Sequence, residues 1–458
     1  GPINNYHMKL CRMKYHLILT PFAGLFFKKL IKFSRELYPV LLIPLTGLFF
    51  LFSSCADSSR SSNELEEIDL YGAYRERTEV PVSNIASGIE YIRLESGEEF
   101  MLNDPHLVNV RDSLILFIGF RKIYIFSRHS GKFLYEISSF GRGPGEYSHT
   151  TNIYDEKRDL FFVSYGSNKR DTNNYQVYYA HDFAGKIVKA VSKPHVFNQD
   201  GDEMPISRFW PLDDTLYAGY ADNLSGNLPE KLVVFDRDGK LINSFPNYNT
   251  CTGYQDLTTF IISANKGKFF NTGDTVRFYE EHTDTIFDIN YKQIKPRYRI
   301  NMGELLFPYH MRISADRSEY PKYFQVNTMH ESSGFLVFSV SIDNFCHLVY
   351  YDKAKKETMV CNMPSESDFY RQTQFTRACC TGFVNDLDDF VPVGTDKNFY
   401  INSNDEFVTL VPALEVKRWF DMNPEKAARL PLHLRAFGDI REEDNPVVVV
   451  ATLKNPGK

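Results

Sequence analysis

Short stretches in which apolar or aromatic residues alternate with polar ones occur along most of this chain. A two-residue period is typical of β-strands with one buried face. Three copies of one pattern have two such stretches joined by a polar turn that ends in Gly-Lys: KIYIFSRHSGKFLYEIS (122–138), QVYYAHDFAGKIVKAVS (176–192) and KLVVFDRDGKLINSF (231–245). Two weaker copies lie at 285–300 and 347–360. Because Asp or His beside Gly suits a turn that needs a positive φ, each copy predicts a β-hairpin.

A further predicted strand, introduced by a polar turn, precedes each hairpin. These strands begin near Asp112, Arg158, Asp213, Asp274 and Ser333, and a sixth begins near Asp396. A repeat of about 45–60 residues is close to that of the four-stranded blades of propellers. The pattern therefore predicts an all-β protein, a six-bladed β-propeller with four-stranded antiparallel blades. The strand GIEYIRLE (88–95) would complete the last blade and close the ring, which removes an exposed sheet edge.

Helical patterns are scarce in this sequence. The clearest one is Asn423–Phe437, with Asn423 as a candidate cap and Pro424 at the first helical position. The 28 Tyr and 38 Phe residues strengthen the β prediction, because aromatic side chains favour half-buried pleated surfaces.

The N-terminal region has the layout of a targeting signal. Four basic residues within 28–35 precede an apolar run at 38–52, and Ser53, Ser54 and Cys55 follow it. The run has about the length of a signal-peptide core and is shorter than the roughly 20 residues of a spanning helix. Small residues directly before a Cys resemble a bacterial lipoprotein box, which predicts cleavage before Cys55 and lipid attachment to its thiol. A transmembrane anchor with an incidental Cys is the alternative.

Three segments follow from this layout. Residues 1–54 are predicted to be the signal peptide and upstream residues, residues 55–85 a flexible tether, and residues 86–458 the propeller. Residues 1–54 contain seven basic residues and one acid, so the remaining chain has 45 basic and 57 acidic residues and a net charge of −12. Nucleic-acid binding needs clustered Lys and Arg, so the sequence predicts no nucleic-acid partner.

The cysteines suggest no disulfide framework or zinc site. Cys11 and Cys55 belong to the leader, and five others remain, at spacings that match no zinc pattern: Cys251, Cys346, Cys361, Cys379 and Cys380. Cys379 and Cys380 could form a vicinal disulfide, but burial in a strand is the favoured interpretation.

The glycine-rich stretch FGRGPGEY (140–147) raises the possibility of a phosphate-binding loop. A P-loop needs Lys-Ser or Lys-Thr and a following helix, and here a loop and a strand follow. The stretch lies between two predicted blades, where its glycines would permit a sharp reversal stiffened by Pro144. We therefore interpret it as a corner between blades.

FGRGPGEY also resembles the signature of NHL-type repeats, and it is especially similar to the six-bladed β-propeller lipoproteins of Bacteroidota. Three further segments resemble that family: 284–304, 382–394 and 442–456. The resemblance spans about residues 86–456. It implies a periplasmic or outer-membrane lipoprotein with a propeller body, in a family whose function is largely unassigned.

Candidate binding residues lie in three places, and each has a structural alternative. Asn385, Asp386, Asp388 and Asp389 in NDLDDF could bind Ca²⁺ or another divalent cation in the channel, as in some NHL-like lactonases and lyases, or could form a solvated turn.

The other two places are the glycine corner and one tryptophan. Arg142, Glu146 and Tyr147 could contact a ligand, although a structural pair of Arg142 with Glu146 is favoured. Trp210 could belong to an aromatic rim for a sugar or peptide, or to the core.

Motifs for nucleophilic or zinc catalysis such as G-x-S-x-G, S-x-x-K and H-E-x-x-H are absent from the sequence. His106 and His330 are expected in polar loops as solvated or structural residues. The favoured hypothesis is a monomeric cell-envelope lipoprotein, held at the outer membrane by its lipid, whose propeller binds a protein, peptide or glycan without catalysis. A metal-assisted lyase or lactonase is the alternative, and an assembly factor for a membrane complex is a third hypothesis.

Overall fold

The computed structural model describes residues 65–102, 107–119, 122–137, 149–164, 177–223, 226–251, 267–313, 318–362 and 380–455. Cys55, His106, Arg142, Glu146, Tyr147 and Cys379 lie outside these ranges, so the predictions made for them stay predictions. Within the ranges, no helix combines the length and apolar character needed to cross a membrane.

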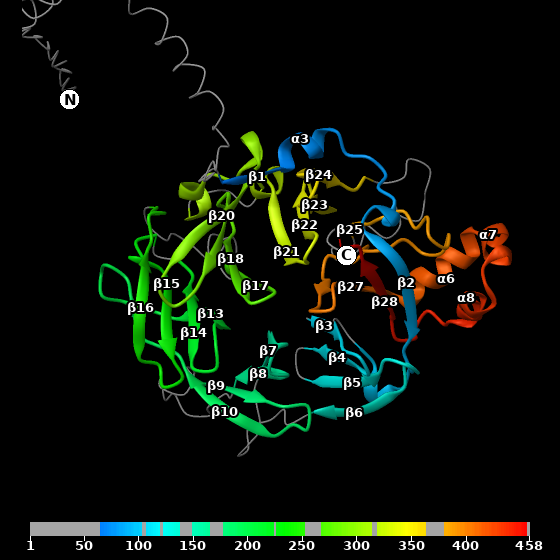
Figure 1. Ribbon diagram of the computed structural model, residues 1–458, viewed down its shortest axis with the longest axis horizontal. Helices are drawn as coiled ribbons and strands as arrows, with labels where there is room; N and C mark the ends of the chain where they lie inside the picture. The colour runs from blue at the N-terminus through cyan, green and yellow to red at the C-terminus, as the bar shows by residue number, and fades with distance from the viewer. Residues whose placement is uncertain are drawn as a thin grey trace, which may run out of the picture. The chain divides into compact units, whose positions relative to one another are not determined.

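Six sheets are arranged in a ring (Figure 1), which confirms the predicted six-bladed β-propeller. Blade 1 contains β3 (Leu107–Val110), β4 (Leu114–Ile118), β5 (Ile123–Ser127) and β6 (Phe133–Ile137). Blade 2 contains β7 (His149–Asp155), β8 (Leu160–Ser164), β9 (Val177–His181) and β10 (Ile187–Ser192). Blade 3 contains β13 (Ile206–Pro211), β14 (Leu216–Ala221), β15 (Glu230–Asp236) and β16 (Leu241–Pro246).

The other three blades carry additional or rearranged strands. Blade 4 contains β17 (Gly267–Thr272), β18 (Thr275–Glu280), β19 (Thr285–Ile289), β20 (Ile294–Asn301) and β1 (Glu66–Asp69). Blade 5 contains β21 (Gln325–Glu331), β22 (Phe335–Ile342), β23 (Phe345–Asp352), β24 (Glu357–Val360) and β25 (Cys380–Thr381). Blade 6 contains β26 (Tyr400–Ile401), β27 (Glu406–Val411), β28 (Val447–Leu453) and β2 (Ala86–Arg93). A small hairpin of β11 (Val196–Phe197) and β12 (Glu203–Met204) follows blade 2 in the chain.

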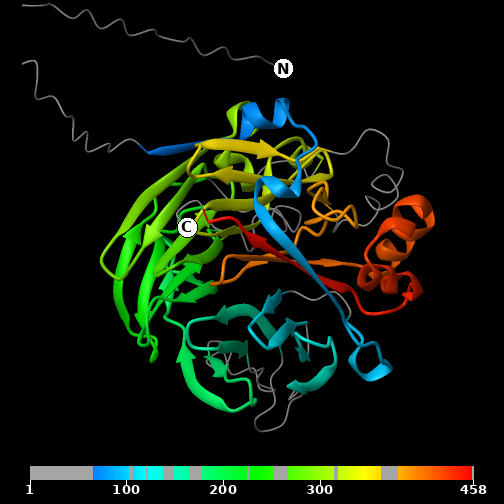
Figure 2. The same ribbon diagram turned by 45° about the vertical axis from the view of Figure 1, so that its right-hand side comes forward.

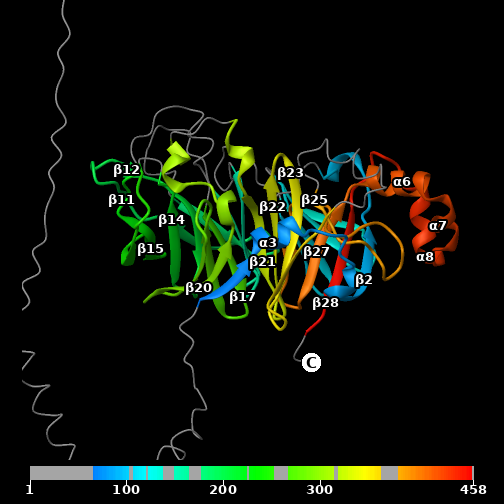
Figure 3. The same ribbon diagram turned by 90° about the horizontal axis from the view of Figure 1, so that it is seen from above.

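The five predicted hairpins are the third and fourth strands of blades 1 to 5, and the strands predicted before them are the second. The first strand of each blade lies nearest the centre of the ring, as β3, β7, β17 and β21 show in Figure 1. Figure 3 gives the edge-on view, with strands running between the two faces of the ring. First strands and the turns after them therefore surround the axis.

The hairpin turns depend on glycine where the sequence predicted it. Gly131, Gly185 and Gly239 have φ of 66°, 76° and 81°, a region that residues with a Cβ rarely adopt. At Gly131 a Cβ would also lie 1.9 Å from the carbonyl oxygen of Arg93 in β2. This turn of blade 1 therefore packs against blade 6 at a distance that only glycine allows.

The sixth blade contains strands from both ends of the described chain. β2, which corresponds to the strand predicted at 88–95, is its outermost strand and pairs antiparallel with β28. The register places Glu90 opposite Val450 and Arg93 opposite Val447.

Residues 65–85, which the sequence placed in a flexible tether, form defined structure. β1 pairs in parallel with β20 on the outer edge of blade 4, and helix α3 (Leu70–Arg75) follows it. Ile68 and Leu70 are fully buried, and Asp69 caps α3 by accepting a hydrogen bond from the backbone N–H of Gly72. The segment is polar overall, so its two apolar anchors were not recognised in the sequence. The ordered strand β1 and helix α3 therefore begin before residue 86, where the sequence placed the start of the propeller.

Three short helices lie at the edge of the ring, beside blade 6 (Figure 2). They are α6 (Ala413–Met422), α7 (Pro424–Arg429) and α8 (Leu432–Arg435). The sequence predicted the region of α7 and α8 but not α6. Trp419, Leu430, Leu434 and Phe437 from this region join the core of blades 5 and 6. Pro424 opens α7 as predicted, whereas the Asn423 side chain donates to the carbonyl oxygen of Trp419 and does not cap the helix.

Single-turn 3₁₀ segments connect several of these elements: η1 (Val82–Asn84), η2 (Glu98–Phe100), η4 (Gly303–Leu305), η5 (Tyr309–Ile313), η6 (Tyr320–Lys322) and η7 (Ala436–Asp439). The second strands of the blades are almost wholly buried, as β4, β14 and β22 illustrate. The core therefore lies between neighbouring blades, where each sheet covers the next.

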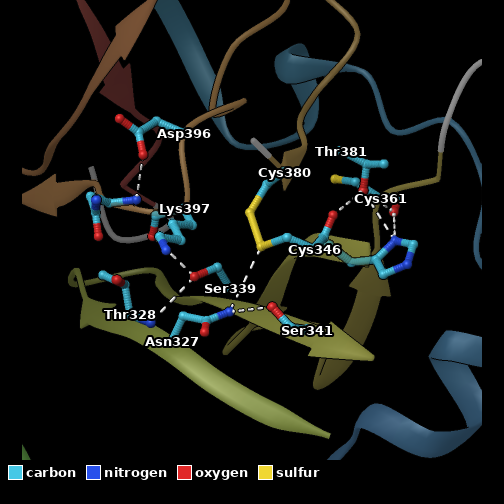
Figure 4. The surroundings of a disulfide bond; sticks show 12 residues. Asn327, Thr328, Ser339, Ser341, Cys346, Cys361, Cys380, Thr381, Asp396 and Lys397 are labelled. Carbon is cyan, nitrogen blue, oxygen red and sulfur yellow. Dashed lines mark hydrogen bonds between the residues drawn. A yellow bond between two sulfur atoms is a disulfide. The ribbon is translucent and has the colours of Figure 1, made fainter. Parts of the chain in front are cut away.

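Blade 5 contains a disulfide between Cys346 and Cys380 (Figure 4), which corrects the expectation that the cysteines form none. Cys380 is buried in a strand, as favoured, but its partner lies 34 residues earlier in the chain. The reason is register, because β25 pairs in parallel with β23 and sets Cys380 directly opposite Cys346. The bond ties the segment that leads to blade 6 onto blade 5.

Candidate functional site

A cavity of about 720 Å³ lies on the axis of the ring, because first strands and the turns after them from all six blades contribute to its wall. Every blade contributes polar or aromatic side chains to the wall: Arg111 of blade 1, Glu156 and Lys157 of blade 2, Trp210 of blade 3, Asn271, Arg277 and Arg297 of blade 4, His330, Glu331 and Lys353 of blade 5, and Tyr400, Ser403 and Asp405 of blade 6. We call this space the axial cavity. Its volume lies in the range of about 300–1,000 Å³ found for small-ligand sites.

Glu331, at the end of β21, is the most heavily paired carboxylate of the wall. Its side chain is 1% exposed. It accepts from Arg277 Nε at 2.8 Å, from Lys353 Nζ at 2.7 Å and from the Tyr298 hydroxyl at 2.9 Å. Arg277 also contacts Asp288. Burial alone would raise the pKa of Glu331, but the bonds and charges of Arg277 and Lys353 outweigh burial and lower it, so Glu331 is held ionised.

The turn after β7 in blade 2 contacts three other blades around the cavity. Glu156 pairs with Arg111 of blade 1 at 3.0 Å and accepts from the backbone N–H of Ser403 in blade 6 at 2.9 Å. It also accepts from the Tyr400 hydroxyl at 3.2 Å. Lys157 pairs with Asp274 of blade 4 at 2.7 Å. The Lys157–Asp274 ion pair and the hydrogen bonds of Glu156 to blade 6 thus join blades that are not neighbours in the ring.

His330 lies in strand β21 and lines the axial cavity, so the expectation that it sits in a polar loop is wrong. The run TMHESS reads as a loop because only its alternate residues, such as Met329, point into the core. The His330 ring packs against Tyr400 with centroids 4.8 Å apart. Burial lowers the pKa of His330 to about 4, so the imidazole is neutral at pH 7.

Trp210 is the candidate residue from the sequence that lines the axial cavity. It is half-buried on β13, and its Nε1–H donates to Asn271 Oδ1 of blade 4 at 3.0 Å. Its ring also stacks on Phe269 at a centroid distance of 6.5 Å. Trp210 therefore packs on the core and also lines the cavity, and its role in binding a sugar or peptide stays a prediction.

The acidic loop NDLDDF lies away from the axial cavity, beside η1, β2 and the core of blades 5 and 6. Asp386 accepts from the backbone N–H and the hydroxyl of Ser83, at 2.9 and 2.5 Å. Burial would raise the pKa of Asp386, but the bonds from Ser83 outweigh it and lower the pKa.

The side chains of Asn385 and Asp388 are bonded to each other and to Tyr91 of β2. Asn385 is buried and donates to Asp388 at 2.6 Å, while the Tyr91 hydroxyl donates to Asp388 at 3.1 Å. Asp389 has a φ of 61°. Across the described ranges, no group of three or more His, Cys, Asp or Glu is placed to hold a metal ion. The binding of a divalent cation, here or elsewhere, stays a prediction.

Sequence reasoning missed the charged residues of the axial cavity. Glu331, Arg111 and Glu156 lie in first strands or the turns after them, and those first strands were not predicted. Arg277 lies in the predicted second strand β18, but the sequence did not single it out. One signal could have found several of them, because the turn before each predicted second strand carries charged or polar residues. In a propeller such turns from successive blades gather around the axis.

These features define the class of protein, a six-bladed β-propeller with an axial cavity lined by paired charges. The chain belongs to the family described as "Domain of unknown function (DUF4934)", whose profile matches residues 65–452. No curated protein matches the chain.

The chain is similar to two solved structures, and the first of them, with a TM-score above 0.5, carries the likeness in fold. A protein from Bacteroides fragilis described as exported is 16% identical with a TM-score of 0.57, over 82% of this chain and 98% of that chain. The extracellular domain of a B. thetaiotaomicron protein described as a hybrid two-component system is 12% identical with a TM-score of 0.33, over 62% of this chain and 34% of that chain. At these identities the likeness concerns the fold alone.

Proposed function

We propose that this chain is a cell-envelope protein that binds a protein, peptide or glycan in the axial cavity without changing it chemically. The observation that carries the proposal is the cavity itself, to which all six blades contribute and in which charged side chains are held in pairs. Such a wall is preorganised, so a ligand need not order it on binding.

The protonation states of the wall favour binding over acid–base catalysis. A general acid or base works best with a pKa near the operating pH. The pKa of Glu331 is lowered and that of His330 is about 4, so at neutral pH both groups stay in one protonation state.

We further propose that the protein is exported and anchored to the outer membrane by lipid on Cys55. The predicted signal sequence supports export, and so does the Cys346–Cys380 disulfide, because such bonds persist in oxidising compartments such as the periplasm. The likeness to a protein described as exported agrees with it.

Replacing Cys55 by serine should move the protein from the membrane fraction to the soluble fraction of disrupted cells. The reason is that the lipid needs the thiol, and residues 65–455 contribute no membrane-spanning helix where they are described. Mass spectrometry of the wild-type N-terminus provides the control, since it should find a lipidated Cys55. An unmodified leader still attached to the wild-type protein would contradict the anchor.

The binding function is tested by equilibrium dialysis of the full chain against panels of peptides and glycans, and mass spectrometry then measures the molecular masses of the recovered ligands. We expect a ligand that binds the wild type and is recovered with unchanged mass. Its affinity should fall about tenfold or more in the Trp210→Ala variant. An Asp386→Asn variant is the matched control, because Asp386 lies outside the cavity and should leave the affinity unchanged.

Two results would contradict the proposal. Binding that Trp210→Ala leaves intact would place the ligand elsewhere. Recovery of a cleaved ligand, with turnover stopped by EDTA, would instead favour the metal-assisted lyase or lactonase.

A further inference from the structure

We infer that the axial cavity takes an uncharged carbohydrate, stacked on the face of Trp210. This inference rests on the proposed function, because it names the class of ligand for the same cavity.

The basic side chains of the wall argue against an anionic ligand. Five basic side chains line the described wall, and each one meets a carboxylate at 3.0 Å or less: Arg111 with Glu156, Lys157 with Asp274, Arg277 and Lys353 with Glu331, and Arg297 with Glu66. An anionic ligand would have to compete with these carboxylates for the cations. Glu331 is buried, so an anion would have to break a buried pair to reach Arg277 or Lys353, whereas the Lys157–Asp274 pair is exposed to solvent and holds Lys157 only weakly.

An uncharged polyhydroxylated ligand faces no such competition. A hydroxyl both donates and accepts, so it can add a hydrogen bond to an already paired carboxylate or to an amide without displacing a partner. Half-exposed or exposed hydroxyl groups line the cavity at Thr272, Ser333 and Ser403. The neutral His330 adds a polar group that carries no charge at pH 7.

Trp210 and Asn271 supply the two contacts that sugars need. The bond from Trp210 Nε1 to Asn271 Oδ1 fixes the plane of the indole, and this aromatic side chain is half-exposed beside the cavity. The C–H face of a sugar ring packs on such an aromatic face. Among the described residues the Nδ2 group of Asn271 has no protein partner, so it can donate to a sugar oxygen next to the indole.

Trp210 also makes the inference measurable. The chain has two tryptophans, and the other, Trp419 of α6, is 5% exposed in the core of blades 5 and 6 and does not line the cavity. A ligand on Trp210 should therefore change the fluorescence of one tryptophan only. Trp419 provides a constant background.

The experiment titrates the full chain with capped trialanine, trigalacturonate and the uncharged trisaccharides cellotriose, maltotriose, mannotriose and N-acetylchitotriose. We expect a saturable change in emission with at least one uncharged trisaccharide, and the same dissociation constant at low and high salt, because screening does not act on an uncharged ligand. In Trp210→Phe the emission change should vanish. Calorimetry should show affinity weakened about tenfold for that variant and about 2–10-fold for Asn271→Ala.

Three outcomes would overturn the inference. Tightest binding by trigalacturonate, with an affinity that falls with salt, would identify an anion site. Tightest binding by trialanine would identify a peptide site, and in both cases the proposed binding function would stand. The inference of a carbohydrate ligand would also be refuted if no trisaccharide, up to about 10 mM, changed the emission or the thermal unfolding temperature of the protein.

Discussion

Replacing Glu331 by alanine should lower the free energy of unfolding by about 3–5 kcal/mol at pH 7, because the change leaves Arg277 and Lys353 without their shared carboxylate. Removing one partner of a buried pair costs more than the pair itself contributes, since the remaining charge stays desolvated. Chemical denaturation followed by circular dichroism measures the difference. Glu443→Ala is the matched control, because Glu443 is 70% exposed and its Arg441 partner lies 3.7 Å away, so its loss should cost under about 1 kcal/mol.

The same substitution has a pH signature. Burial opposes ionisation of Glu331, but Arg277 and Lys353 lower its pKa below the value of about 4.3 in an unfolded chain. Because the pKa of Glu331 is lowered in the folded state, its ionised carboxylate contributes its full stabilisation above about pH 4.3. This stabilisation is lost as the pH falls through the folded-state pKa. The difference in the free energy of unfolding between the wild type and Glu331→Ala should therefore shrink only below about pH 4. A loss of stability no larger than that of Glu443→Ala would contradict this picture of the wall.

Removing the Cys346–Cys380 disulfide should cost roughly 3–4 kcal/mol, because the bond closes a loop with a sequence separation of 34 and limits the unfolded chain. Denaturation of the Cys346→Ser/Cys380→Ser double variant measures this loss. A reductant should lower the stability of the wild type to that of the variant, and it should leave the variant unchanged.

The same comparison provides the control for the other thiols. Cys251 and Cys361 are free in the structure, so the reductant should act through one bond among the described cysteines. If mass spectrometry shows the bond reduced while stability stays at the wild-type value, the bond does not hold blade 5 to the segment that follows it.

Most of the propeller could be predicted from local patterns. Second, third and fourth strands of blades 1 to 5 are rich in apolar residues and end at Gly or Asp turns, so their period and spacing were visible. The first strands were not, because sequences such as HTTNIYD (149–155) and QVNTMHE (325–331) contain many polar residues. Their strand state depends on pairing with the second strands, which is a tertiary property.

The candidate site was less predictable than the fold for the same reason. Glu331 and Arg277 are separated by 54 residues, and only the packing of blade 5 on blade 4 joins them. Trp210 was a candidate because an aromatic side chain can belong to the rim of a sugar or peptide site, and no signal pointed to its Asn271 partner. Conversely, NDLDDF looked like a cation site because its acids are adjacent in sequence, whereas Asp386 and Asp388 are bonded to Ser83 and Tyr91.

The most direct test of the account is a crystal structure of the full chain with the trisaccharide that binds most tightly. We expect a ligand inside the axial cavity, in contact with Trp210 and Asn271, with the Arg277–Glu331 and Arg111–Glu156 pairs intact. A ligand bound on the outer strands β6, β10 or β16, or a cavity whose ion pairs had opened to admit a charged group, would contradict it.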